Sequence, residues 1–280
     1  MISGPARGYH LLQSKGKDTM RLATWNVNGL RARLDYIDHW LKDRQPDVVG
    51  LQELKTPDDQ FPHEHFKALG YDALIHGQKS WNGVAILAKH PMTLKQQGLK
   101  EQDEFGARLI TAEIVSPTGN TFDFTTVYCP NGKTLEHADF ARKLDWYKSL
   151  IRYWQQSAST KHLICGDFNI VPAAIDGWRG AAGEGSIFYT QDERKHLQDL
   201  LDQGLTDLFR DRYPDAQEFS WWDYRGGAFH RKHGLRIDFL LATETLQQTT
   251  TEVVIDREYR RKIEDLTPSD HAPVFADLDI

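Results

Sequence analysis

The sequence is poor in cysteine and contains no apolar segment long enough to cross a bilayer. Cys129 and Cys165 each lie at the end of an apolar run, so we expect two buried thiols and no disulfide framework. Residues 1–20 lack the apolar core of a signal peptide and instead combine glycine, proline and charged residues. We therefore expect a cytoplasmic protein without membrane contacts, in which residues 1–20 are a disordered extension and residues 21–280 form a single domain.

A net positive charge is also missing, because 40 acidic residues outnumber 34 lysines and arginines and the formal net charge is −6. This balance argues against a protein that coats nucleic acid by charge alone, but it is compatible with a local basic surface. Two groups are candidates for such a surface: Arg225, Arg231, Lys232 and Arg236, and then Arg257, Arg260, Arg261 and Lys262. Ordinary solvated loops are the alternative for both groups.

Tryptophan, in contrast, is abundant, and the eight indole rings could serve a core or a surface on which bases stack. Apolar spacing predicts helices over residues 32–44 and 136–155, and residues 191–201 and 206–210 also look helical. Strand patterns outnumber helix patterns, and neighbouring strands joined by short turns favour antiparallel pairing. This balance predicts an α/β fold in which two sheets pack face to face with helices outside.

Polar side chains recur where apolar, strand-like segments end. The segment that ends at Gly166 is followed by Asp167 and Asn169, which share one face of an extended chain while Phe168 faces the core. Asp and Asn are common turn residues, so this segment alone could be a simple turn. The repetition is harder to explain in that way, and the full set of exit residues is Asn26, Asn28, Glu53, Tyr128, Asp167, Asn169, Asp238, Asp270 and His271.

Hard oxygen atoms dominate this set, which favours Mg²⁺ or Mn²⁺ over Zn²⁺. Asp238 lies inside an apolar run, where an isolated charge is costly, and His271 is a plausible partner. A carboxylate on one ring nitrogen would leave the other nitrogen free to face a substrate. The alternatives are an ion pair of Asp238 with Arg236 or Arg231 and a turn role for His271.

The chain resembles the exonuclease III family of apurinic/apyrimidinic (AP) endonucleases, within the endonuclease/exonuclease/phosphatase superfamily. The resemblance covers residues 21–280 and rests on the segments TWNVNGLRAR, DVVGLQELK, VYCPNG, GDFN, SWWDYR, LRIDFLLA and SDHAPV. GDFN and SDH would also fit DNase I-like enzymes that act on other phosphoesters, whereas SWWDYR and LRIDFLLA point to the AP endonuclease branch. The resemblance implies a four-layer αββα sandwich of two mixed, largely antiparallel sheets, with the active site at one edge.

The resemblance also implies a metal site. Glu53 would be a direct ligand, and Asn28 and Asp270 would lie in or beside the site. The metal would be Mg²⁺, for which Mn²⁺ could substitute. Asp167 would activate or position the attacking water, and Asn169 and Asn26 would orient Asp167 and the scissile phosphate.

The remaining implied roles concern the substrate. Tyr128 would contact the scissile phosphate, and His271, held by Asp238, would bond a phosphate oxygen. Trp221 and Ile237 would line the pocket for a flipped abasic sugar. Two further DNA contacts are expected, from Arg108 just before a strand and from the basic loop at Arg231 and Lys232.

The implied function is a Mg²⁺-dependent DNA-repair phosphodiesterase that cuts 5′ to abasic sites, with 3′→5′ exonuclease activity and trimming of blocked 3′ ends. Its partner would be double-stranded DNA with such lesions, and the protein would be a monomer that associates with the nucleoid in a bacterium.

Two alternatives stay open from the sequence. One is a phosphodiesterase or phosphatase for a small molecule or lipid head group, and the other is a non-catalytic module that binds DNA ends or abasic sites.

Overall fold

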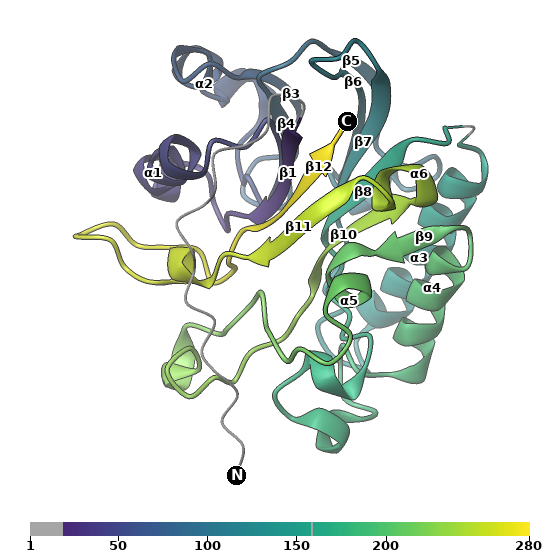
Figure 1. Ribbon diagram of the computed structural model, residues 1–280. Helices are drawn as coiled ribbons and strands as arrows, with labels where there is room; N and C mark the ends of the chain where they lie inside the picture. Colours follow the sequence, from purple (N-terminus) through teal and green to yellow (C-terminus); the bar gives the residue numbers. More distant parts are fainter. Residues whose placement is uncertain (1–18, 158) are drawn as a thin grey trace.

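Strand β1 (Thr19–Asn26) shows how the sequence builds the layers, because its side chains alternate between two apolar clusters. Met20 and Leu22 are fully buried in a cluster that lies between two sheets, whereas Ala23 and Trp25 are buried against helix α1 (Leu34–Arg44). A strand with period-two burial on both faces must lie between two layers. The computed structural model describes residues 19–157 and 159–280, and the other strands continue this arrangement (Figure 1).

Two six-stranded sheets form the centre of the sandwich. The first has the order β11-β12-β1-β2-β4-β3, and its other strands are β2 (Val48–Gln52), β3 (Asp72–His76), β4 (Val84–Ala88), β11 (Thr250–Ile255) and β12 (Val274–Asp279). The second has the order β5-β6-β7-β8-β10-β9, with β5 (Met92–Gln97), β6 (Leu109–Val115), β7 (Thr121–Tyr128), β8 (His162–Asp167), β9 (Leu205–Asp207) and β10 (Asp238–Thr243). Only β1 with β2 and β7 with β8 pair in parallel among the described strands; the other pairs are antiparallel.

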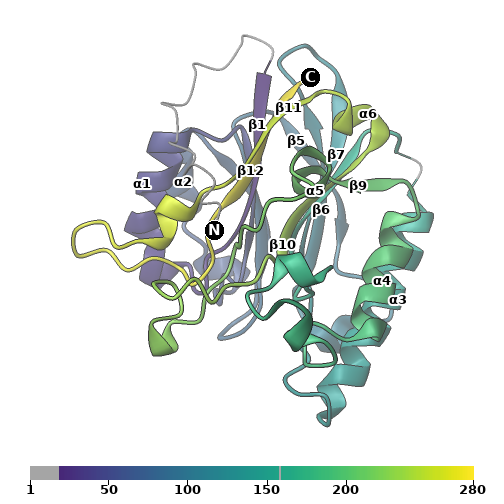
Figure 2. The same ribbon diagram turned by 60° about the horizontal axis from the view of Figure 1, so that its bottom comes forward.

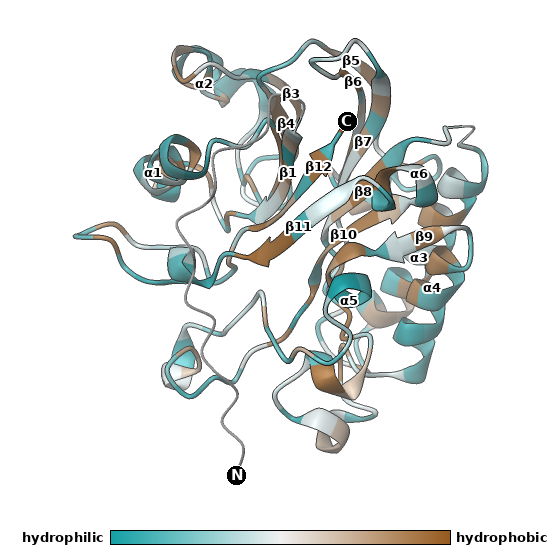
Figure 3. Cartoon of the chain, viewed as in Figure 1, coloured by the Kyte–Doolittle hydropathy of each residue, from teal (hydrophilic) through white to brown (hydrophobic). Residues whose placement is uncertain are grey.

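Helices cover the outer face of each sheet, which completes the expected four layers (Figures 1 and 2). Helices α1 and α2 (His63–Ala68) cover the first sheet, and α3 (Ala138–Gln155) and α4 (Gln191–Leu201) cover the second. Two short helices, α5 (Leu208–Arg212) and α6 (Glu244–Gln247), lie beside the ends of the strands. Apolar residues concentrate on the strands and on the inner sides of the helices (Figure 3). The αββα prediction is confirmed.

Several element boundaries differ from the sequence-based predictions. Residues 205–207 form strand β9, and the helix predicted over 206–210 begins only at Leu208, because three residues of this segment pair with β10. Thr19 and Met20 belong to β1, so the domain begins earlier than residue 21. The remainder of the predicted N-terminal extension, residues 1–18, lies outside the described residues. Among the described residues, no helix is both long and apolar enough to cross a membrane.

Gly166 is required where β8 approaches β7 at the end of the second sheet. Its φ is +144°, and a Cβ atom at this position would lie 1.9 Å from the carbonyl oxygen of Val127. No side chain fits at that distance, so only glycine lets β8 keep its parallel pairing with β7 as far as Asp167.

We predict that Gly166→Ala lowers the free energy of unfolding by about 2–4 kcal/mol, since it combines a disfavoured φ with a steric clash. Gly119→Ala is the matched control, because Gly119 also has a positive φ of +83° but no other group lies within 4 Å of the place that a Cβ atom would take. It should cost only about 1–2 kcal/mol. Urea unfolding of both variants measures the difference, and equal losses would contradict the role assigned to the close approach.

Candidate active site at the shared edge of the sheets

Strands β1, β2, β7 and β8 deliver polar side chains to one edge of the sandwich, the edge that is turned toward the viewer in Figure 2. Asn26 ends β1, Tyr128 ends β7 and Asp167 ends β8, while Glu53 directly follows β2. The alternation along β1 and β8 points Asn26 and Asp167 into the layer between the sheets, in phase with the buried Leu22 and Cys165. The edge therefore brings together residues that are far apart in the chain.

The amide of Asn26 connects the two sheets. Its Nδ2 donates hydrogen bonds to Oε1 of Glu53 and to Oδ2 of Asp167, each at 2.9 Å. Asn26 is fully buried and Asp167 is nearly so. Two carboxylates from different sheets are thus held toward the same space by one neutral donor group.

Two matching turns follow the exits of β1 and β8. Asn28 (φ 47°) donates its backbone N–H to Oδ1 of Asn26 at 3.0 Å, and Asn169 (φ 51°) donates its own to Oδ1 of Asp167 at 3.0 Å. Asn tolerates this left-handed conformation better than most residues. Asn169 therefore orients Asp167 through its backbone, while its side-chain amide donates to the carbonyl oxygen of Cys129 at 3.0 Å.

His271 and Asp238 form a buried pair beside Asp167. The Nδ1 atom of His271 lies 2.9 and 3.1 Å from the two carboxylate oxygens of Asp238, and its Nε2 atom lies 3.7 Å from Oδ2 of Asp167. Ser220 donates to Asp238 Oδ2 at 2.6 Å. This pairing decides between the alternatives that the sequence left open, since the partner of Asp238 is His271 and neither Arg236 nor Arg231.

The charges of this cluster are strongly coupled. Burial raises the pKa of Asp167 to about 7; the charge of Asp238 adds to this rise, and that of His271 opposes it. Burial alone would lower the pKa of His271, but the carboxylates of Asp238 and Asp167 raise the pKa of this imidazole to about 10. At neutral pH the histidine is therefore a cation with its Nε2 proton directed toward the space in front of Asp167.

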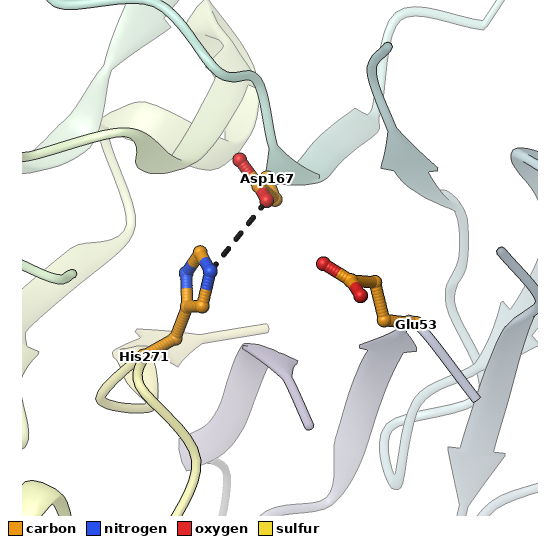
Figure 4. A group of neighbouring side chains, drawn as sticks. All are labelled: Glu53, Asp167 and His271. Carbon is orange, nitrogen blue, oxygen red and sulfur yellow. Dashed lines mark ion pairs between the residues drawn. The ribbon is translucent and has the colours of Figure 1, made fainter. Parts of the chain in front are cut away.

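Glu53, Asp167 and His271 each offer a ligand atom, and these atoms all lie within 4.8 Å of one another (Figure 4). A metal needs a deprotonated imidazole, and the raised pKa of His271 opposes that. The two carboxylates, converging from either side on the amide of Asn26, fit a hard divalent cation better. Glu53 is thus the stronger candidate ligand, and His271 is better suited to donate a hydrogen bond.

The predicted neighbours of the metal site lie on the other side of Glu53. Asn28 donates its side-chain amide to Oδ1 of Asp270 at 2.9 Å. Lys55, which sequence reasoning missed as a functional residue, bonds Oδ1 of Asn28 at 2.5 Å and lies 3.0 Å from Oε2 of Glu53. It follows Glu53 by two residues, and that short spacing after a strand exit was the available sequence evidence.

Tyr128 faces the same space from β7. Burial raises its pKa well above the ordinary value, and the charges of Glu53 and Asp167 act in the same direction, so the phenol keeps its proton. Arg108 lies over the Tyr128 ring at 4.8 Å and donates to the carbonyl oxygens of Phe105 and Tyr128. These contacts place Arg108 behind Tyr128, where it fixes the position of the ring.

Trp221 and Ile237 lie beside the His271 side of the cluster. Trp221 donates its Nε1 proton to Oδ2 of Asp270 at 3.0 Å, and its ring centre lies 6.5 Å from that of His271. Ile237 is only 2% exposed and packs in a small apolar cluster against Trp221. The structure therefore brings both residues next to the charged groups, with Trp221 the more accessible.

The basic groups divide into exposed and structural members. Arg231 and Lys232 are exposed on the loop before β10, as expected. Arg236 is wrongly included among possible DNA contacts, because it is 1% exposed and its guanidinium pairs with Asp176 and Asp207. Arg260 is also buried and donates to the backbone carbonyl oxygens of Asp270 and Trp222.

Comparisons with known proteins agree with this geometry. The sequence pattern described as the Endonuclease/Exonuclease/phosphatase family matches residues 23–271. Exodeoxyribonuclease III of Haemophilus influenzae is 35% identical over 272 residues, which cover 92% of this chain and 100% of the relative. Two solved structures superimpose with a TM-score of 0.87 and cover 93% of this chain and 100% of theirs. One is the 3′ phosphatase NExo from Neisseria bound to a product DNA hairpin, at 36% identity, and the other is an AP endonuclease from Archaeoglobus fulgidus, at 30% identity.

We predict that Asp238→Asn lowers the pKa of His271, because it removes the charge that offsets the burial of the imidazolium. NMR titration of the histidine ring nitrogens in EDTA-containing buffer measures this change. Asp145→Asn, an exposed change on α3, is the control and should leave the titration unaltered. If His271 titrates at the same pH in Asp238→Asn as in Asp145→Asn, the proposed coupling between His271 and Asp238 is refuted.

Proposed function

This chain belongs to the endonuclease/exonuclease/phosphatase family, and from that premise we propose that it is a metal-dependent DNA-repair nuclease that incises 5′ to abasic sites. It hydrolyses phosphodiester bonds, and it also removes nucleotides and blocking groups from 3′ ends. The observation that carries this proposal is the cluster in which Asn26 holds Glu53 and Asp167 together beside the His271–Asp238 pair. A non-catalytic binding module would have no need for two converging carboxylates, one of them buried.

Hydrolysis of a phosphodiester requires an oriented water, an acceptor for its proton and positive charge near the phosphoryl oxygens. Asp167 is the proton acceptor, because a pKa of about 7 lets it take a proton near neutral pH. Asn26 and the backbone N–H of Asn169 fix the two oxygens of Asp167. The carboxylate can therefore be aimed at one water without losing orientation.

The scissile phosphate lies between His271 and Tyr128 in this proposal. His271 donates its Nε2 proton to a phosphoryl oxygen, and Asp238 keeps the ring charged and in place. The phenol of Tyr128 donates a second hydrogen bond from the neighbouring strand. His271 is buried and Tyr128 is partly buried, so their hydrogen bonds to an anion are less weakened by solvent than those of exposed groups.

The metal in this proposal is Mg²⁺, with Mn²⁺ as a substitute; Glu53 would hold it, with Asp270 and Asn28 beside the site. When bound, a divalent cation there would supply positive charge to the phosphoryl oxygens and the leaving group. Lys55 pairs with Glu53 and bonds Asn28, so it keeps this carboxylate in position. One chain provides every proposed group, which is compatible with action as a monomer.

The substrate in this proposal is duplex DNA with abasic sites or blocked 3′ ends. A nucleotide without a base is cheaper to extrude from the stack, and Trp221 with Ile237 provides an apolar wall for the bare sugar. Because its substrate is the genome, the enzyme would act in the cytoplasm, at the nucleoid, if its source is a bacterium.

We predict that Asp167→Asn lowers the turnover number by about 10²–10⁴-fold, because the amide cannot accept a proton from water. Incision of a duplex with one abasic analogue, with Mg²⁺ or with EDTA, measures the effect. EDTA should abolish incision by the unaltered enzyme. Asp145→Asn serves as the exposed control. Full activity of Asp167→Asn would eliminate Asp167 as the base, and metal-independent incision by the unaltered enzyme would overturn the proposed function.

We further predict that the double variant Arg231→Ala with Lys232→Ala binds DNA more weakly. Binding should release up to about two fewer counterions, which makes the dependence of affinity on salt less steep. The control removes two exposed charges from the outer helices, Lys148→Ala with Lys195→Ala. Fluorescence anisotropy of labelled duplex DNA at several salt concentrations gives the slope of log K against log salt. An unchanged slope for the first double variant would exclude the loop as a phosphate contact.

A further inference from the structure

We propose that Trp178 and His233 form a platform on which an unpaired base of the substrate DNA stacks, close to the bond that is cut. The proposal rests on the DNA-nuclease function above and names a contact that selects among DNA substrates. Trp178 belongs to the glycine-rich stretch after β8, and His233 belongs to the loop that carries Arg231 and Lys232. Neither residue takes part in the charged cluster.

The two rings are stacked in parallel, with centroids 3.9 Å apart and planes inclined by 13°. Trp178 is nevertheless 41% exposed, so a large part of the indole is not covered by protein. Most tryptophans are buried because an indole contributes much apolar area to a core. A half-exposed indole that is braced by a second flat ring is the geometry that a stacking ligand requires.

The chain beneath the platform is held by buried ionic contacts. Asp176 and Arg236, each 1% exposed, pair at 2.6 Å, and the backbone N–H of Arg236 donates to the carbonyl oxygen of Asp176. The N–H of Trp178 donates to the carbonyl oxygen of Gly234 at 3.0 Å. These contacts join the two loops on either side of the stack. Trp178 is thus pre-positioned, and little ordering entropy is lost when a base stacks on it.

A ladder of backbone bridges connects the platform to the charged cluster. Gly177 pairs with Leu235, Leu235 pairs with Trp221, and Trp221 pairs with His271. Neighbouring extended segments lie about 4.8 Å apart, so three such steps place the platform on the order of 15 Å from His271. At about 3.4 Å of rise per nucleotide, this distance corresponds to roughly four nucleotides from the scissile phosphate.

The surroundings of the platform suit a nucleic acid strand. Arg179 lies over the Trp178 ring with its guanidinium carbon 5.3 Å from the ring centroid, and Arg231 and Lys232 are exposed on the neighbouring loop. Cationic side chains around an exposed ring favour an anionic, flat ligand. Inside a duplex both faces of a paired base are covered by its neighbours, so away from the duplex ends only an unpaired base can offer a face to Trp178.

The test uses two kinds of duplex, each with one abasic analogue. In the first kind all other bases are paired, and in the second kind one mismatch lies one to four nucleotides from the lesion, on either strand. Dissociation constants are measured by anisotropy in EDTA, for the unaltered protein and for Trp178→Ala, Trp178→Phe and Leu94→Ala. Leu94 is an exposed apolar residue on β5 and controls for loss of surface area. A duplex with 2-aminopurine at the mismatch reports stacking through its fluorescence.

We expect one mismatch position to tighten binding by the unaltered protein and to quench 2-aminopurine. Trp178→Ala should raise the dissociation constant for that duplex by roughly 5- to 150-fold and abolish quenching, with the paired duplex unaffected. Trp178→Phe should keep most of the preference, and Leu94→Ala should keep all of it.

The platform would be overturned if Trp178→Ala weakened binding to paired and mismatched duplexes equally. It would also be overturned if Trp178→Phe lost the mismatch preference to the same extent as Trp178→Ala. If Trp178→Ala does not fold, the unaltered protein and Trp178→Phe still decide the matter, because absence of any mismatch preference or quenching refutes the proposal. Binding in EDTA does not depend on catalysis. A failure of Mg²⁺-dependent incision would therefore refute the nuclease function separately from the platform.

Discussion

The shared hydrogen bonds of one buried amide hold the charged edge of this protein together. Asn26 donates to carboxylates that come from different sheets, so Glu53 and Asp167 face each other only when both sheets are docked in register. A bond from a neutral donor to a charged acceptor contributes about 1.5–3 kcal/mol, but two adjacent carboxylates also repel each other. The remaining repulsion is relieved by the cation His271 and, in the proposed function, by a bound metal.

The same arrangement explains why the site needs two central parallel strand pairs. The pair β1–β2 presents Asn26 and Glu53 side by side, and the pair β7–β8 presents Tyr128 and Asp167 in the same way. Carboxyl ends of parallel strands necessarily emerge at one edge of a sheet. Antiparallel neighbours on both sides then bring in the residues that come later in the chain, at the start of β10 and just before β12.

Much of this fold could be predicted from apolar periodicity, because its central elements are buried on defined faces. Helix α4 has the bounds expected from the sequence, and Phe168 is buried in the core as expected. The edge strands β3 and β5 have no such pattern, since most of their residues are partly or fully exposed. Strand β9 has only three residues, and its pairing with β10 overrides a local helical preference.

The parts of the candidate site where strands end in acids and amides could be predicted from the sequence. The roles of residues whose partners come from distant segments could not, because only the folded chain shows which side chains are buried together. Arg236 is a basic residue in a basic loop, and nothing in its sequence neighbours reveals the acidic partners that arrive from residues 176 and 207. Ser220 supports Asp238 from a separate segment, a contact that only the folded chain creates. Lys55 shows the intermediate case, since the sequence places it near Glu53 without showing its bond to Asn28.

The position of β12 has a consequence for the order in which the charged edge is assembled. This strand follows all the others in the chain, yet it lies inside the first sheet between β11 and β1, and His271 lies three residues before its start. Until β12 has docked, β1 lacks one of its two neighbours and Asp167 lacks the cation that faces it. Because a domain folds as a unit, the charged edge is complete only when β12 has paired with β1 and His271 has reached Asp167.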